Sequence, residues 1–396
     1  MFTLGVQLRP IVLSLWALQA FATGFHPSSV HASFKHVSSR RQAKSTPVEP
    51  SRPGEAVPVR LLKNPDEIRG ENRYGAINNS TIPSAKEAAV AVGVKPPKGN
   101  ASKKTWQRAW RMHKRVMPLL HLGDRCKPPD SSLSLAVLWW KALSGNDILS
   151  PVADDGLSYD MLPYIQRKIV SRRLRRFFPR LHHANVEIRT SYLDRAVSKV
   201  VETMHIGPGG GSRIKVRLIS LGAGYDIRSI KLMERKQIDE AIELDLPEVV
   251  EAKTKLFTKR LLKRRRSSLA QSDLPTLISV DLNKIDGIDG VRKQLEGIVC
   301  NGSAGEIWHN IFVFEGVMIY LDKEVPSALL RTCSDVLNRN GMQGSLCFAD
   351  LLENVPEGDR KYAEEEMARN GWQLNDWLPK PGLARHMGSA SLVAIK

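Results

Sequence analysis

The segment VRLISLGAGYDIRSIKL, Val216 to Leu232, decides the fold of this chain. Its first part is typical of a buried strand, and it leads through Gly222-Ala223-Gly224 into an amphipathic stretch. Glycines let the backbone turn tightly and approach a ligand, and the N-terminus of the next helix offers free N–H groups. The third glycine of the dinucleotide-binding fingerprint is absent, because Ile227 stands there. The alternative is an ordinary tight turn between a strand and a helix.

Strands and helices alternate after this segment. We predict strands at 214–221, 240–245, 276–281, 309–315 and 343–349, and a further one at 389–396. Helices are expected near 226–236, 247–263, 288–298 and 324–338. Alternation of this kind makes parallel βαβ units, so the predicted fold is an α/β doubly wound, mostly parallel sheet.

Four segments are expected along the chain. Residues 1–48 are interpreted as a targeting presequence. Residues 49–130 are interpreted as an irregular or disordered arm with a helix near 101–121. Residues 131–205 are expected to form a helical cap, and residues 214–396 the α/β core of the same 131–396 domain.

An acidic residue ends each of three predicted strands. Asp245 ends the second strand, Asp281 the third and Glu315 the fourth. Ligands of open α/β sheets lie beyond the carboxyl ends of the strands, so these side chains are candidates for one site. The alternatives are a helix N-cap for Asp245, an Asx-turn for Asp281 and a structural ion pair for Glu315.

Three carboxylates suit an adenosyl ligand with a cationic centre better than a pyrophosphate. S-adenosylmethionine carries a sulfonium, an ammonium and a ribose diol, all of which suit acids. Its methionine carboxylate needs a cation, and Arg189 and Arg195 precede the sheet in IRTSYLDR. The alternative for both arginines is a surface charge on a helix.

The order and spacing of several motifs resemble the leucine carboxyl methyltransferase-like family of S-adenosylmethionine-dependent methyltransferases. The resemblance covers roughly residues 131–350, and it includes a stretch similar to the family's N-terminal helical cap. The motifs that carry it are IRTSYLDR, LISLGAGYDIRSIKL, AIELDLPEVVEAK, LISVDL and FVFEGVMIYLDKEVPSALL.

The resemblance implies a Rossmann-like class I methyltransferase fold and a set of cofactor contacts. The implied residues are Gly222, Ala223, Gly224, Asp245, Asp281, Leu282 and Glu315, with Arg189 or Arg195 for the carboxylate. One departure is Ile227, where the family usually has threonine.

The expected activity is methyl transfer to a carboxyl or hydroxyl oxygen of a small molecule or of a protein C-terminus. A carboxylate acceptor needs no general base, whereas a hydroxyl does. His182, His183 and Tyr192 are candidates for such a base, and packing or solvation is the alternative. Aromatic residues that could line an acceptor pocket, or belong to the core, are Trp139, Trp140 and Tyr159.

The formal net charge of +18 is concentrated in three acid-free segments. Residues 1–48 hold five basic residues, 167–180 hold seven and 253–266 hold eight. The two internal runs motivate an alternative, an RNA-modifying or RNA-binding methyltransferase, and solvated helix faces are the plainer interpretation. A third alternative is a domain that has kept the fold and lost catalysis.

The N-terminus carries the apolar run PIVLSLWALQAFATGF, which has the length of a signal peptide. A segment rich in serine, arginine and lysine follows, and the first acid is Glu49. This pattern predicts delivery to a plastid through a signal-plus-transit presequence, with secretion or the endoplasmic reticulum as the alternative, and no membrane span in the mature chain. The four cysteines form no CxxC pair, which argues against a zinc site or disulfide framework.

Overall fold

The computed structural model describes the chain from residue 85 onward, with gaps. The described residues are 85–94, 132–145, 152, 154, 156–162, 167, 180–206, 213–265, 268–301, 306–356, 358–380 and 385–393. The predicted presequence 1–48, the predicted helix near 101–121 and most of the run 167–180 lie outside these residues.

A seven-stranded sheet organises the described residues, in the order β3-β2-β1-β4-β5-β7-β6. The first five strands are parallel, and β7 lies antiparallel between β5 and β6. The strands are β1 (Lys215–Leu221), β2 (Glu240–Asp245), β3 (Thr276–Ser279), β4 (Trp308–Glu315), β5 (Gln343–Asp350), β6 (Trp372–Trp377) and β7 (His386–Leu392). The predicted α/β doubly wound, mostly parallel sheet is therefore confirmed.

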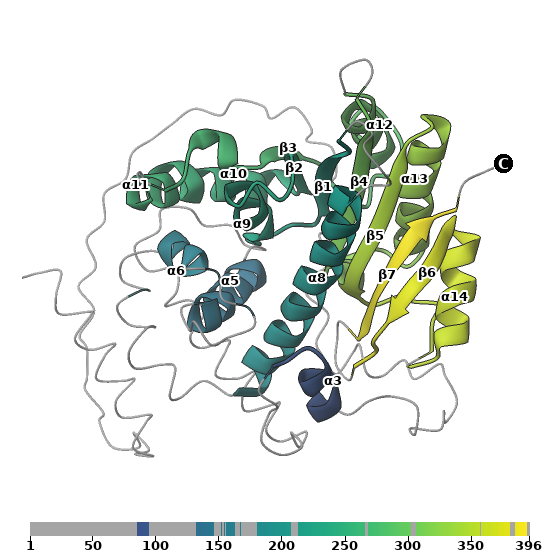
Figure 1. Cartoon of the computed structure of the whole chain (residues 1–396), viewed down its shortest axis with the longest axis horizontal. Coiled ribbons are helices and arrows are strands. Elements are labelled where there is room, and N and C mark those ends of the chain that lie inside the picture. The colour runs from purple at the N-terminus through teal and green to yellow at the C-terminus, as the bar shows by residue number, and fades with distance from the viewer. Residues whose placement is uncertain are drawn as a thin grey trace, which may run out of the picture. The chain divides into compact units, whose positions relative to one another are not determined.

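Helices cover both faces of the sheet (Figure 1). Those within the α/β part are α9 (Arg228–Glu234), α10 (Pro247–Leu256), η2 (Phe257–Leu261, a π-helical turn), α11 (Leu262–Arg264), η3 (Gln271–Asp273), α12 (Val291–Cys300), η4 (Met318–Tyr320), α13 (Val325–Arg339) and α14 (Arg360–Arg369). Those that precede the sheet in the chain are α3 (Ala85–Ala91), α5 (Ser132–Gly145), α6 (Leu157–Met161) and α8 (Arg180–Ile206).

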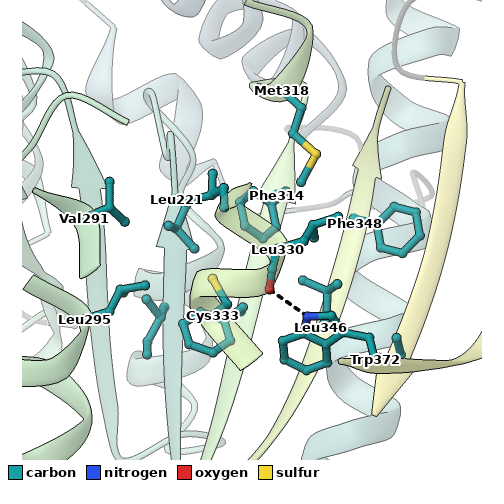
Figure 2. Packing of buried hydrophobic residues seen from close by; sticks show 14 of the residues in the cluster. Leu221, Val291, Leu295, Phe314, Met318, Leu330, Cys333, Leu346, Phe348 and Trp372 are labelled. Carbon is teal, nitrogen blue, oxygen red and sulfur yellow. Dashed lines mark hydrogen bonds between the residues drawn. The ribbon is translucent and has the colours of Figure 1, made fainter. Parts of the chain in front are cut away.

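Alternate residues of each strand point to opposite faces, so the central strands are buried on both sides. On one face, Leu221, Phe314 and Leu346 pack against α12, α13 and α14 (Figure 2). In that cluster the indole Nε1 of Trp372 donates a hydrogen bond of 2.9 Å to the carbonyl of Leu330, which fixes β6 against α13. On the other face, Leu218 belongs to a cluster with side chains of α8 and α3.

A third apolar cluster joins the cap helices to the α/β part. Trp139 of α5 and Met161 of α6 share it with Ile230 of α9 and with the buried side of α10 and η2. The predicted helical cap is thus observed in its described parts, α5, α6 and α8. Through this cluster the cap lies beside the helices that follow β1 and β2.

Three elements depart from the predictions. The segment 49–130 is not wholly irregular, because it contains α3, whose Ala88 and Ala89 are buried against α8. Helix α14 and strand β6 were not predicted. Most residues of α14 are polar, and β6 alternates buried and exposed side chains, so neither has the apolar run that marked the other elements.

Candidate active site

The carboxyl ends of β1, β2, β3 and β4 lie at one edge of the sheet. Leu221 pairs in register with Leu244 and with Phe314, and Asp245 pairs with Ser279. The three predicted acids therefore lie at the same edge of the sheet. Asp245 and Glu315 end their strands, and Asp281 lies two residues beyond Ser279. This is the arrangement that the sequence predicted.

The glycine turn after β1 is held tightly against its neighbours. Gly222 has a φ of +67°, and an added Cβ would lie 2.2 Å from a methyl carbon of Val317, so no other residue fits without displacement. The amide of Gly222 donates to the carbonyl of Leu244 at 2.8 Å. Gly224 also has a positive φ, of +48°. The turn, with Ala223 at its centre, presents backbone at the carboxyl edge of the sheet.

Asp245 is anchored by backbone groups. One carboxylate oxygen accepts from the amide of Gly224 at 2.6 Å and the other from the amide of Leu246 at 2.8 Å. Burial raises the pKa of Asp245, and these two hydrogen bonds oppose the rise. The carboxylate thus links the glycine turn to the end of β2.

Asp281 and Leu282 follow β3 in a loop. Asp281 accepts a hydrogen bond of 3.0 Å from the amide of Asn283, which is the Asx-turn considered above. Leu282 is buried in the apolar cluster beneath the loop. The position of both residues agrees with the expectation, and a contact with adenine remains a prediction.

Glu315 lies within a group of cations. Its two oxygens accept from Arg189 Nε at 3.0 Å, Lys141 Nζ at 3.1 Å and Arg228 Nη2 at 2.9 Å. The hydroxyl of Thr190 donates a fourth hydrogen bond at 3.1 Å. Burial alone would raise the pKa of Glu315, but the three cations hold it well below its usual range.

These contacts extend into a network of four cations and three acids. The seven residues share seven ion pairs, all within 3.1 Å, and are Lys141, Arg189, Asp194, Asp226, Arg228, Lys231 and Glu315. Five of them line a hollow with Thr190 and Asp154, and Glu315 and Arg189 adjoin it through their ion pairs. The network carries one more positive than negative charge.

Arg189 and Arg195 have different roles. Arg189 belongs to the network, and its guanidinium lies against Gly316, where an added Cβ would be 2.8 Å from Nη1. Arg195 is exposed and donates to the carbonyl of Ala91 at 2.9 Å, at the C-terminal end of α3. The structure therefore places Arg195 outside the network, and Arg189 within it.

Sequence reasoning missed Lys141, Asp226 and Arg228. Lys141 is the one charged residue in the apolar stretch SLAVLWWKAL, and a lone lysine on an apolar helix was the signal that could have found it. Asp226 and Arg228 stand directly after the glycine turn and form an ion pair of 2.6 Å. All three side chains are almost fully buried.

The described candidates for a general base and an acceptor pocket, Tyr192, Trp139, Trp140 and Tyr159, are not members of this network. Tyr192 donates to Asp376 at 3.0 Å, and burial together with that carboxylate raises the pKa of Tyr192, so it is not poised to accept a proton. The side chains of His182 and His183 lie outside the described part. Trp139 and Trp140 belong to the cap core, and the Tyr159 ring lies 5.6 Å from the guanidinium of Arg167.

The basic run 253–266 is largely occupied by internal contacts. Lys253 forms a buried ion pair of 2.5 Å with Glu243, Lys255 pairs with Glu251 and Arg265 pairs with Asp160. Arg260 and Arg264 donate to carbonyls at the C-terminal end of α6. Within the described residues of the run, the exposed basic side chains are Lys259 and Lys263, which leaves little free charge for phosphates.

The described residues show neither a metal-ligand cluster nor a membrane-spanning helix. They contain no group of three or more His, Cys, Asp or Glu side chains that could hold a metal ion. None of the described helices has the length and apolar character needed to span a bilayer.

The strand order, the antiparallel β7 and the glycine turn with acids at neighbouring strand ends together define a class of protein. It is the class I, S-adenosylmethionine-dependent methyltransferases.

A comparison of the sequence with family models gives a match to part of the chain. Residues 152–334 match the family described as leucine carboxyl methyltransferase, which confirms the resemblance drawn from the motifs. The matched residues run from the cap through β4 and into α13, and they include six of the seven residues of the network.

Solved structures give only distant matches. Magnesium protoporphyrin IX methyltransferase (ChlM) from Synechocystis PCC 6803 with bound SAM is 13% identical, covers 54% of this chain and 83% of its own, and has a TM-score of 0.33. The methyltransferase domain of bacterial CtHen1-CN is 16% identical over 50% of this chain and 97% of its own, with a TM-score of 0.32. A protein described as a pericyclic reaction enzyme is 13% identical and covers 83% of each chain, with a TM-score of 0.32. Similarity at this level says nothing about the reaction, and the curated proteins gave no match.

Proposed function

We propose that this protein binds S-adenosylmethionine at the carboxyl edge of its sheet and transfers the methyl group to a carboxyl or hydroxyl oxygen. The observation that carries the proposal is the mixed-charge network at the end of β4. Its acids and cations suit the ammonium and carboxylate of an amino acid, and its excess positive charge suits the carboxylate.

The residues present fit the cofactor by their chemistry. Arg189 and Lys141 are the cations that would hold the methionine carboxylate, and Glu315 is the acid that would accept from the ammonium. Asp245 keeps lone pairs beyond its two backbone hydrogen bonds and would accept from the ribose hydroxyls. Asp281 and the Leu282 amide are the groups proposed for the adenine ring.

The protein's contribution to the reaction is alignment and exclusion of water. S-adenosylmethionine, when bound, supplies an electrophilic methyl group on a positively charged sulfur. Because the reaction removes that charge, a dry and shaped site with fixed dipoles accelerates it. The cap helices α5 and α8 bring Lys141 and Arg189 to the site, so the same elements that hold the cofactor would also shield it.

Isothermal titration with S-adenosylmethionine tests the proposal directly. We expect saturable binding by the full chain, and weaker binding when Arg189 is replaced by methionine. The matched control is Arg195→Met, because Arg195 lies on the same helix and outside the network. Absence of heat at high micromolar protein would contradict the proposal, and equal affinities of both variants would remove Arg189 from the site.

The acceptor is proposed to be a small molecule or a protein C-terminus, since its carboxyl oxygen is already a nucleophile and needs no base. We also propose plastid delivery through residues 1–48, on the apolar run and the acid-free stretch that follows it. A fluorescent fusion of residues 1–60 tests this, and a secreted fusion would exclude it.

A further inference from the structure

Helix α3 and the three residues that follow it form a strap on α8, residues 85–94 (Figure 1). Four side chains of the strap are at most 2% exposed, namely Ala88, Ala89, Val92 and Val94. They share an apolar cluster with Ile188 and Leu193 of α8. Because a helix of seven residues is marginal by itself, α3 depends on this burial. The strap precedes the segment 152–334 that matches the family, so the matched segment does not account for it.

Two carbonyl groups at the C-terminal end of α3 accept hydrogen bonds from side chains of α8. The last carbonyls of a helix have no partner within it, and here α8 supplies the partners. The hydroxyl of Ser191 donates to the carbonyl of Val92 at 2.8 Å in a buried bond. Arg195 donates to the carbonyl of Ala91 at 2.9 Å in an exposed bond. Hydrogen bonds are stronger away from water, so Ser191 is the main polar anchor and the strap stays docked without Arg195.

The same turns of α8 carry the side chains that reach the charged network. Arg189 and Thr190 donate to Glu315 at 3.0 and 3.1 Å. Arg189 and Ser191 are two residues apart, which corresponds to about 200° of rotation around the helix, so they point to nearly opposite sides. The strap therefore holds one flank of α8 while the other flank contacts Glu315.

We propose that the strap is a positioning element of the cofactor site. By docking on one flank of α8 it fixes the rotation of the helix that brings Arg189 and Thr190 to Glu315. The proposal rests on the proposed function, in which Arg189 holds the methionine carboxylate. Without the strap, α8 takes up several rotations, and the apparent affinity for the cofactor falls with the fraction of molecules in the competent one.

Calorimetry of full-length variants with S-adenosylmethionine tests the positioning role. Val92→Asp combined with Val94→Asp places two charges in the buried cluster and undocks the strap. We expect this double variant to bind the cofactor about tenfold more weakly than the wild type. The matched control is Val90→Asp, because Val90 lies on the same helix and is 62% exposed, and it should bind as the wild type does. Equal affinities of the double variant and the control would overturn the proposal.

A double-mutant cycle with Arg189→Met separates positioning from a general loss of stability. If the strap acts through Arg189, undocking it should lower cofactor affinity about tenfold in the wild-type background and less than about threefold in the Arg189→Met background. Its effect on the midpoint of urea denaturation should be the same in both backgrounds. An equal loss of affinity in both would show that the strap supports the fold alone, and would contradict the proposal.

Ser191→Ala keeps the proposal testable if the double variant does not fold. It removes one buried hydrogen bond to the strap and leaves the apolar contacts in place, so the chain should fold. We expect cofactor binding about threefold weaker than in the wild type. The control is Thr203→Ala, because Thr203 donates to the carbonyl of Lys199 on the exposed surface of the same helix. Affinity of Ser191→Ala equal to that of the control would count against the strap.

Hydrogen exchange of the cofactor-free protein distinguishes failure of this inference from failure of the proposed function. Backbone amides of residues 186–196 should exchange faster in the double variant than in Val90→Asp, because α8 has lost its support. A wild type that binds no S-adenosylmethionine would sink the proposed function and the link from strap to cofactor, whatever the exchange rates. A wild type that binds the cofactor, with affinity and exchange both independent of the strap, would remove only the present inference.

Discussion

Asp245 and Glu315 stand at equivalent places, each at the end of a parallel strand, yet they are held by different means. Asp245 accepts from two backbone amides, one 21 residues before it and the other adjacent. Glu315 accepts from four side chains, three of which come from α5 and α8, more than 120 residues away in sequence. The pKa of Asp245 is raised by burial, whereas that of Glu315 is held low.

The difference shows that burial sets the charge of a carboxylate only together with its partners. Amides donate hydrogen bonds without carrying net charge, so they offset part of the desolvation of Asp245. At Glu315, the attraction of three cations outweighs the effect of desolvation on the pKa, so the pKa is lowered. Asp245 is thus suited to accept from neutral hydroxyls, and Glu315 to act as a fixed anion within a charged site.

The largest effect should come from Glu315→Ala. It leaves Lys141, Arg189 and Arg228 with one buried acid fewer, so we expect the free energy of unfolding to fall by about 3–5 kcal/mol. Affinity for S-adenosylmethionine should fall on the order of 100-fold or more. Urea denaturation and calorimetry measure the two quantities.

The control for Glu315→Ala is Glu251→Ala. Glu251 pairs with Lys255 on the exposed side of α10, so its loss should leave both quantities unchanged. If Glu315→Ala were as mild as this control, the network would have no part in the cofactor site.

A smaller effect is expected for Asp245→Ala. Because the carboxylate links the glycine turn to β2 and is proposed to accept from the ribose, its loss should weaken cofactor binding by about 1–3 kcal/mol. Calorimetry with S-adenosylhomocysteine measures this change. An affinity equal to that of the wild type would show that Asp245 serves the turn alone.

A fall in pH should change the stability contributions of Asp245 and Glu315 in opposite directions. The folded-state pKa of Glu315 is depressed, so its stabilising contribution is present above its ordinary value of 4.5 and is lost as pH falls through the folded pKa. The folded-state pKa of Asp245 is raised, so its charge opposes folding above that pKa, and protonation relieves the cost as pH falls. Comparing urea denaturation of Glu315→Gln and Asp245→Asn with wild type from pH 7 to 3 should give differences of opposite trend.

The smallest effect is expected at the basic run. Lys259 and Lys263 are exposed, so Lys259→Glu combined with Lys263→Glu should change stability by no more than about 0.5 kcal/mol and leave cofactor affinity unchanged. Gel retardation with tRNA at low salt should show no binding by either protein. Salt-sensitive retardation of the wild type that the double variant loses would support the RNA alternative instead.

Local patterns predicted most of the fold. Apolar runs and turn residues placed the five parallel strands within a few residues of their observed ends, and the glycine turn and three strand-end acids fell at one edge. Strand β6, helix α14 and helix α3 were missed because few of their residues are buried, so their sequences lack a strong apolar period. Membership of Lys141, Asp226 and Arg228 in the site was missed because burial and pairing of charges depend on distant partners.

The sequence by itself determined which chemical groups follow which strand: glycines after β1 and acids at the ends of β2, β3 and β4. It could do so because strand ends follow from local apolar runs. Only the tertiary structure decided which cations meet those acids. By sequence, Arg189 and Arg195 are equally good candidates for the cation of the site, because both lie in one predicted helical segment. Six residues along a helix correspond to about 600° of rotation, so the two side chains face different directions. One reaches Glu315 and the other reaches α3.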